Sequence, residues 1–264
     1  MLRFWQWGKK DQTLDSEATA EEIVEDFSNS EAVAAYFYEE SGVTFAKQMG
    51  IFTNKARLFA KKNNISSFTI LLRQLQSDEE LKQRFIDYLT TNETYFYREF
   101  KQIEALVRAI KQDPIKKPVS ILCAPCSTGE EPYSIAIALL EAGISAEHFH
   151  ITGIDINQEA LSKAQKARYK ERNVRNLSKE ILQRYFHKEH TDYRLDAAVQ
   201  KSITFKRINI FDPALAHLGK FDYIFSRNML IYFDQKKKAE ARSILESLRR
   251  DLDTPIFYGH ADLF

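Results

Sequence analysis

The sequence predicts an α/β protein with an open, mostly parallel sheet, preceded by an all-helical N-terminal domain. Three observations support this prediction. From residue 119 onward, short apolar runs alternate with stretches of helical periodicity, as they do in βα units. Several of these runs end on a polar residue, where a strand would reach the edge of the sheet. Before residue 91, apolar residues recur only at helical spacing.

Composition limits the classes of function. The chain has 264 residues, of which 44% are hydrophobic and 28% charged, so it can bury one large core and one small one. Its 38 Lys and Arg against 37 Asp and Glu give a net charge of +1, which provides no general attraction to nucleic acid or to a membrane surface. No apolar run is long enough to cross a bilayer, and the first residues lack the apolar core of a secretory signal. We therefore expect a cytoplasmic protein that neither binds nucleic acid nor inserts into a membrane.

The two cysteines, Cys123 and Cys126, are too few for a zinc site, and we expect no metal. Their spacing is that of a redox motif in thioredoxin-like contexts. Because they lie on a predicted strand and the turn after it, we interpret them as small packing residues. Nothing about them requires an oxidising compartment.

The N-terminal part divides into a tail, residues 1–29, and a helical domain, residues 30–91. The tail is acidic from Asp11 to Asp26, a composition that favours disorder, although its aromatic start could dock. Basic residues gather on the domain, and on charge alone they are most simply a solvated helix face. The expected helices are 31–40, 54–63, 67–75 and 78–89, and the basic residues are Lys47, Lys55, Arg57, Lys61 and Lys62.

A strand, a small-residue turn and a helix follow one another between residues 119 and 140. The turn, residues 125–129, should face a ligand, because ligands of open α/β sheets lie outside the carboxyl ends of the strands. No Lys follows Gly129, so the turn is not a P-loop. Glu130 and Glu131 would repel a pyrophosphate but attract a cationic ligand such as S-adenosylmethionine. The alternative is that the two carboxylates only favour the start of the helix.

Further strands deliver polar residues to the same edge. Residues 148–154 end at Asp155, which could accept hydrogen bonds from ribose hydroxyls or cap the following helix. Residues 202–208 end at Asn209, and residues 221–226 end at Arg227 and Asn228. Helix capping alone explains such a series poorly. A dinucleotide-dependent oxidoreductase would share Asp155 but would have no reason for two carboxylates beside a pyrophosphate.

Four motifs, in order along the chain, resemble those of the CheR family of chemoreceptor glutamate methyltransferases. The resemblance extends from about the Ser41-Gly-Val-Thr-Phe45 segment to Gly259-His260. It implies a Rossmann-like S-adenosylmethionine-dependent methyltransferase domain over residues 92–264, with a small inserted β-subdomain at about 187–203. The motifs are Asn92-Glu-Thr-Tyr-Phe-Tyr-Arg98, Cys126-Ser-Thr-Gly-Glu-Glu-Pro-Tyr-Ser134, Leu182-Gln-Arg-Tyr-Phe186 and Phe225-Ser-Arg-Asn-Met-Leu-Ile-Tyr-Phe-Asp234.

The resemblance also implies roles for individual residues. Glu130 would face the amino-acid end of S-adenosylmethionine, whose product is S-adenosylhomocysteine, and Asp155 would hold the ribose. Arg98 and Tyr232 are the expected catalytic residues, which orient the carboxylate. A glutamate is ionised near pH 7, so no general base is needed, and His260 is the only residue we weigh for that role. The cofactor-binding residues implied are Asn92, Thr94, Arg98, Glu130, Asp155, Asn209, Ile210, Asn228 and Met229.

The implied partner is the cytoplasmic domain of chemoreceptors. In the family, a basic helix of the helical domain faces the acidic methylation region, and the β-subdomain docks receptor tails. A non-catalytic adaptor that keeps the cofactor pocket is the alternative function. Family members usually continue beyond the strand expected at 255–259, so we expect one sheet edge to lack a strand.

Overall fold

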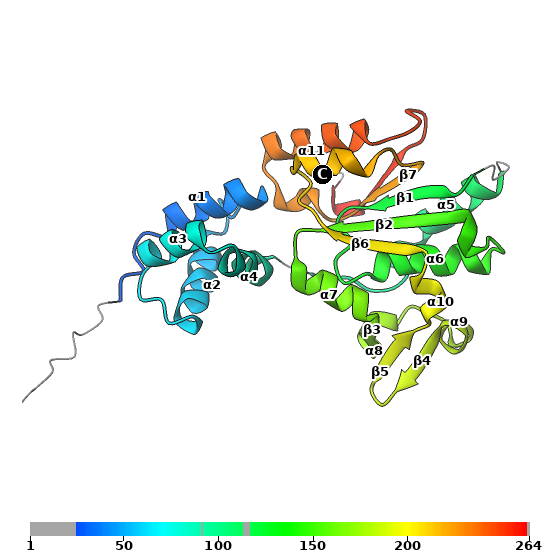
Figure 1. The fold of residues 1–264 in the computed structure, drawn as a ribbon, viewed down its shortest axis with the longest axis horizontal. Coiled ribbons are helices and arrows are strands. Elements are labelled where there is room, and N and C mark those ends of the chain that lie inside the picture. The colour runs from blue at the N-terminus through cyan, green and yellow to red at the C-terminus, as the bar shows by residue number, and fades with distance from the viewer. Residues whose placement is uncertain (1–24, 91, 113–116, 263–264) are drawn as a thin grey trace, which may run out of the picture.

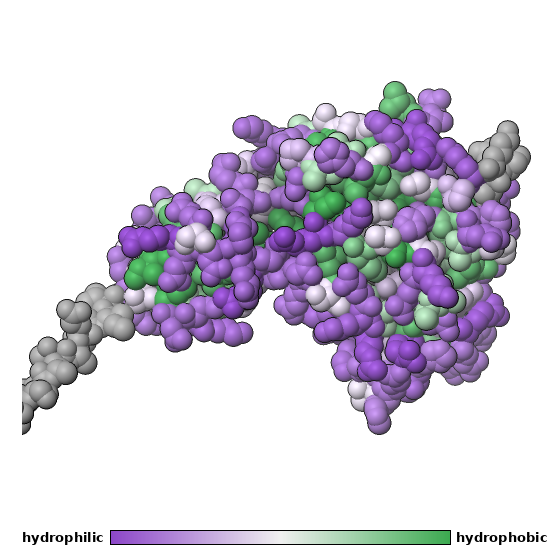
Figure 2. Space-filling model, viewed as in Figure 1, coloured by the Kyte–Doolittle hydropathy of each residue, from purple (hydrophilic) through white to green (hydrophobic). Residues whose placement is uncertain are grey.

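The computed structural model describes residues 25–90, 92–112 and 117–262, so the tail expected over residues 1–29 lies outside the described residues up to position 24. Within this part, no helix is long and apolar enough to cross a membrane. The helices before the sheet form one group and the sheet with its covering helices another (Figure 1). On the face drawn in Figure 2 the surface is mostly hydrophilic, and hydrophobic residues show where the two groups meet.

Four helices build the first group around a core rich in phenylalanine. Phe37, Phe52 and Phe85 are at most 1% exposed and contact one another through tilted and edge-to-face rings. Two of the helices begin on side-chain caps, because Ser67 accepts from the Ile70 amide and Asp78 from the Leu81 amide. The helices are α1 (Ser30–Ser41), α2 (Met49–Lys62), α3 (Phe68–Ser77) and α4 (Glu79–Leu89).

A five-stranded parallel sheet forms the second group, in the order β6-β2-β1-β7-β8. Along the chain the sheet first grows from β1 through β2 to β6 and then resumes on the other side of β1 with β7. The order therefore reverses at β1, and the crevice at such a switch point is where open α/β sheets bind ligands. The strands are β1 (Val119–Cys123), β2 (Phe149–Asp155), β6 (Ile203–Arg207), β7 (Tyr223–Ser226) and β8 (Ile256–Tyr258).

Helices cover both faces of this sheet (Figure 1). Side chains of β1 alternate between the faces: Ile121 and Cys123 pack into the core beneath α5 and α6, whereas Leu122 and Ala124 pack into the core beneath α11. The expected strands of this unit and the helix that follows the first of them are confirmed, and α5 is an addition. The helices are α5 (Phe100–Gln112), α6 (Glu130–Glu141), α7 (Gln158–Lys166) and α11 (Gln235–Ser247), and the short 3-10 turns are η1 (Ala146–His148), η2 (Pro213–Leu218), η3 (Leu230–Tyr232) and η4 (His260–Asp262).

A small antiparallel sheet, in the order β3-β5-β4, projects from the main one. It begins earlier than the expected 187–203, at β3 (Arg168–Lys170), and ends with β5 (Asp192–Leu195). Strand β3 was not predicted from the sequence, because Tyr169 is its only buried residue and one buried residue produces no alternating pattern. The remaining elements are β4 (Phe186–Glu189), α8 (Glu171–Val174), α9 (Lys179–Tyr185) and α10 (Ala197–Gln200), the last of which is a helical turn inside the range expected for the β-subdomain.

Candidate functional site

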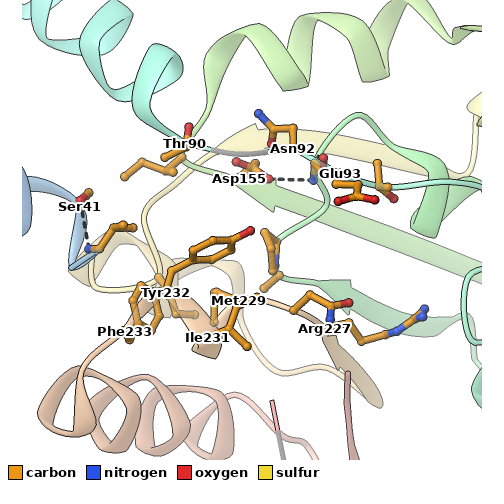
Figure 3. A pocket seen from close by; sticks show the side chains of 18 of the residues that line it. Ser41, Thr90, Asn92, Glu93, Asp155, Arg227, Met229, Ile231, Tyr232 and Phe233 are labelled. Carbon is orange, nitrogen blue, oxygen red and sulfur yellow. Dashed lines mark hydrogen bonds between the residues drawn. The ribbon is translucent and has the colours of Figure 1, made fainter. Parts of the chain in front are cut away.

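A cavity of about 840 Å³ lies at the carboxyl ends of the parallel strands, between the sheet and the N-terminal helices. Figure 3 shows side chains converging on it from both groups. Most of the residues that we expected at the site line this cavity, although they come from four separate segments. They are Asn92, Thr94, Arg98, Asp155, Asn209, Ile210, Asn228, Met229 and Tyr232.

Asp155 stands at the tip of β2 and joins the floor of the cavity to the turn after β1. Its Oδ2 accepts from the Ser127 amide at 2.7 Å (Figure 3). Its Oδ1 accepts from the Asn157 amide at 2.9 Å. Burial raises the pKa of this carboxyl to about 6, although the backbone amides that it accepts from lower it. Each oxygen keeps a further lone pair, so the carboxylate can still accept hydroxyl donors of a ligand.

Asn157 ties this strand tip to the N-terminal helices. Its side chain donates to the Thr90 hydroxyl at 2.7 Å and to the Asp87 carbonyl at 3.1 Å, and the Asp87 carboxylate accepts from the first amides of α7. Asn157 is 1% exposed. The position of Asp155 is therefore linked to the docking of α4 on α7.

Glu130, which the resemblance places at the amino-acid end of the cofactor, does not line the cavity in this structure. It is fully buried on the other side of the turn, where it accepts from the Thr128 hydroxyl at 2.6 Å and from the Asn173 side chain at 2.7 Å. The reason is the direction of the first helical turn. Gly129 precedes α6 in a left-handed conformation, with φ of 90°, and this directs the first side chain of the helix toward α8.

Glu131, the next residue, is the carboxylate that lines the cavity. It pairs with Arg227 at 2.9 Å, and burial raises its pKa while Arg227 opposes that rise. The Cys123 thiol lies close enough to lower this pKa, yet Glu131 Oε1 accepts no hydrogen bond of ordinary geometry from the described residues. A buried carboxylate oxygen with spare capacity is suited to a cationic donor.

Arg227 holds two segments of the cavity wall together. Its guanidinium, 4% exposed, donates to Glu131 and to the Arg98 carbonyl at 2.6 Å, and lies 3.7 Å from Glu99. The sequence placed Arg227 at a strand tip without indicating that it is buried. Burial of an arginine depends on partners that lie far away in the sequence, so no local pattern marks it.

The open side of the cavity carries Arg98 and Tyr232. Burial raises the pKa of the Tyr232 phenol, and the nearby Arg98 guanidinium opposes this rise. Arg98 also donates to the Glu93 carbonyl at 2.9 Å, which fixes part of its donor fork. At neutral pH the pair therefore offers a cation and a protonated hydroxyl, both of which can donate to an anion.

The loop after α1 forms the opposite wall, and residues 41 and 43–48 line the cavity. The Thr44 amide donates to the Tyr232 carbonyl at 2.9 Å, and the Asn209 side chain donates to the Glu40 carbonyl at 2.9 Å. The resemblance to the CheR family begins in this loop, at about Ser41-Gly-Val-Thr-Phe45, but the sequence alone did not indicate a role for it. Two members of the basic cluster, Lys47 and Lys55, also line the cavity.

Asn228 and the end of the chain meet in a tight contact. Asn228 has a left-handed φ of 58°, and its amide donates to the Asp262 carboxylate. A Cβ at Gly259 would lie 2.8 Å from this amide, so only glycine permits the approach. His260 is exposed and does not line the cavity.

The described residues contain no group of three or more His, Cys, Asp or Glu side chains arranged to hold a metal ion. Cys123 and Cys126 are free and buried, and burial raises the pKa of both thiols. They pack between the sheet and α6, as the sequence indicated.

Comparison with known proteins identifies relatives over most of the chain. Residues 92–264 match the family model described as "CheR methyltransferase, SAM binding domain". A chemotaxis protein methyltransferase of Campylobacter jejuni is 36% identical over 228 residues, which cover 85% of this chain and 84% of the relative. Chemotaxis protein methyltransferase 2 of Vibrio cholerae is 35% identical, covering 86% and 82%. The Escherichia coli chemotaxis protein methyltransferase is 29% identical, covering 88% and 83%.

Proposed function

Because the chain belongs to the CheR methyltransferase family, we propose that it transfers methyl groups from S-adenosylmethionine to glutamate side chains of chemoreceptors, giving glutamyl methyl esters. The chain carries the S-adenosylmethionine-binding domain of this family over residues 92–264. The observation that best supports the proposal is the composition of the cavity. It joins buried carboxylates at one end to Arg98 and Tyr232 at its open side.

The residues present fit the cofactor. Glu131, which lines the cavity, would hold the cationic amino group, and Asp155 would accept from the ribose hydroxyls. Bound here, S-adenosylmethionine supplies an electrophilic methyl group on a sulfonium sulfur. The other lining residues would position the remaining parts of the cofactor: Asn209, Ile210 and Met229 near the adenine, and Asn92, Thr94 and Asn228 through neutral hydrogen bonds.

Arg98 and Tyr232 would orient the glutamate carboxylate at the open side. Burial keeps the Tyr232 hydroxyl protonated near pH 7, so it donates a hydrogen bond and is not a base. Orientation of two reacting groups, together with exclusion of water, is a sufficient source of rate acceleration when the nucleophile is already ionised. None of the described residues that line the cavity is a histidine, which agrees with a reaction that needs no base.

The test is transfer of a labelled methyl group from S-adenosylmethionine to the cytoplasmic domain of a chemoreceptor. We expect incorporation that is released as methanol in mild base, the property of an ester. The single-turnover rate should stay flat from about pH 6.5 to 8.5, because the unperturbed glutamate pKa is about 4.3. Tight binding of S-adenosylhomocysteine with no incorporation would favour the non-catalytic adaptor.

A further inference from the structure

The outer face of α2 carries apolar and basic side chains in alternation. Ile51, Lys55, Leu58 and Lys62 recur at intervals of three or four residues, so they form one stripe along the helix, which we call the α2 stripe. Ile51 is 51% exposed and Leu58 is 57% exposed, although the other side of α2 is buried in the phenylalanine core. The helix contains no acidic residue. Such a surface is suited to a segment that combines acidic and apolar side chains.

The chain enters the described structure at the carboxyl end of this stripe. Glu25 pairs with Lys61 at 2.6 Å, and the Asp26 amide donates to the Ser66 carbonyl at 3.0 Å. Phe27 packs edge-to-face on Phe68, with 5.1 Å between ring centroids. These contacts fix the point from which the preceding residues extend, and one acidic residue is already paired with α2 there.

The segment before this point is acidic and contains apolar residues. Residues 11–26 contain no Lys or Arg. We propose that residues 11–24 bind along the α2 stripe of the same molecule, with acidic side chains on its lysines and apolar ones on Ile51 and Leu58. The acidic residues are Asp11, Asp15, Glu17, Glu21 and Glu22, and the apolar ones are Leu14, Ile23 and Val24.

Length and energy are compatible with this proposal. The 14 residues of α2 span about 21 Å, which a segment of similar length covers even in its most compact helical form. Exposed ion pairs contribute at most about 1 kcal/mol each and are screened by salt. Tethering raises the effective concentration of the segment to about millimolar, so a weak and reversible contact can be populated.

The contact would regulate access to the site, a consequence that rests on the proposed function. Ile51 and Lys55 of α2 line the cavity, and so does Lys47 in the loop before α2. A glutamate-rich partner approaching the open side would meet the same lysines. The acidic segment would therefore compete with the partner and raise its KM without changing kcat.

Tryptophan fluorescence tests the contact in a parent variant, Trp5→Phe/Trp7→Phe/Leu14→Trp, whose only tryptophan then lies within residues 11–24. In the full chain without cofactor or receptor, we expect acrylamide to quench this fluorescence less at low salt than at high salt. The variant Glu17→Gln/Glu21→Gln/Glu22→Gln should lose that protection, and so should Lys61→Glu/Lys62→Glu. The control Lys166→Glu/Lys179→Glu reverses exposed charges on α7 and α9 and should keep it.

Equal quenching in this parent and in all three charge variants built on it would overturn the proposal. Protection that grows with protein concentration would mean that the segment binds a second copy, and would also overturn it. Methyl transfer to the receptor is measured only in the triple Gln variant, because this variant leaves α2 intact. We expect its KM for the receptor to be lower than that of the wild type, at unchanged kcat. If no methyl transfer occurs but the protection behaves as described, the proposed function fails and the contact stands.

Discussion

The two walls of the cavity differ in how their residues are held. The sheet wall, formed by the ends of β1, β2 and β7, is fixed by buried polar contacts such as those of Asp155 and Arg227. The helical wall, residues 41 and 43–48, joins it through single hydrogen bonds such as the one from Thr44 to the Tyr232 carbonyl. Buried, mutually bonded groups lose more than exposed ones when a partner is removed. The sheet wall should therefore determine cofactor affinity, and the helical wall access to it.

The largest effect should follow from Arg227→Met. The change leaves Glu131 buried without its ionic partner, which costs about 3–5 kcal/mol for a pair of this kind. We expect a clear loss of stability in urea unfolding and loss of S-adenosylhomocysteine binding. Arg250→Met is the matched control, because Arg250 pairs with Asp222 nearer the surface, where a pair contributes at most about 1 kcal/mol. Equal losses in the two variants would remove the distinction between buried and exposed contacts.

Asp155→Ala should have the next largest effect. Hydrogen bonds to a charged group contribute about 1.5–3 kcal/mol, which corresponds to a loss of affinity for S-adenosylhomocysteine of about 10- to 150-fold. Calorimetric titration measures it. Asp212→Ala is the control: Asp212 likewise follows a strand and accepts from a backbone amide, but it does not line the cavity. An unchanged dissociation constant in the Asp155 variant would reduce this residue to a structural acceptor of the Ser127 and Asn157 amides.

The elements were predictable from the sequence where apolar residues recur with one period. The strand that ends at Asp155 and the helices around Phe37 and Phe85 are of this kind, because their buried positions repeat along a local segment. The small sheet was predicted to begin too late, because its first strand, β3, contributes one buried residue, Tyr169, too few to produce a pattern. The 13-residue helix α5 was not predicted, although its buried residues Ile103, Leu106 and Ile110 have helical spacing.

Individual site residues followed a different rule. A residue at the tip of a parallel strand was placed correctly at the cavity, since topology alone brings these tips together, as for Asp155, Asn209 and Asn228. Contacts that depend on side-chain direction were not predictable. Which of two adjacent glutamates faces the cavity depends on the rotation of α6 about its axis, and that rotation is set by Gly129 and by packing against α8.

The pH dependence of Asp155 separates stability from binding. Its pKa rises from 3.8 unfolded to about 6 folded, so between these values the folded protein binds more protons than the unfolded chain. For this group alone, stability therefore increases as pH falls through about 6. Affinity for S-adenosylhomocysteine should change in the opposite direction and weaken about tenfold between pH 7 and 5, because the ionised carboxylate is the acceptor. Calorimetric titration at each pH measures this, and Asp155→Asn should flatten the profile. A profile unchanged in that variant would assign the titration to another group.

The smallest effect should follow from Glu130→Gln, since Glu130 belongs to neither wall. The amide oxygen can accept from Asn173, and the amide nitrogen can donate to the Thr128 hydroxyl, which both accepts and donates, so both hydrogen bonds survive. Affinity for S-adenosylhomocysteine should stay within about twofold, which is less than the contribution of one neutral hydrogen bond.

Glu131→Gln, one residue further along α6, removes the charge that faces the cavity and should weaken binding by more than tenfold, as expected for a charge-assisted bond. Titration of both variants with S-adenosylhomocysteine, which keeps the amino group, makes the comparison. The opposite result would be that Glu130→Gln weakens binding as much as Glu131→Gln, with no change in melting temperature. Glu130 would then contact the amino-acid end of the ligand, as the resemblance implied, and α6 would have to rotate when the ligand binds.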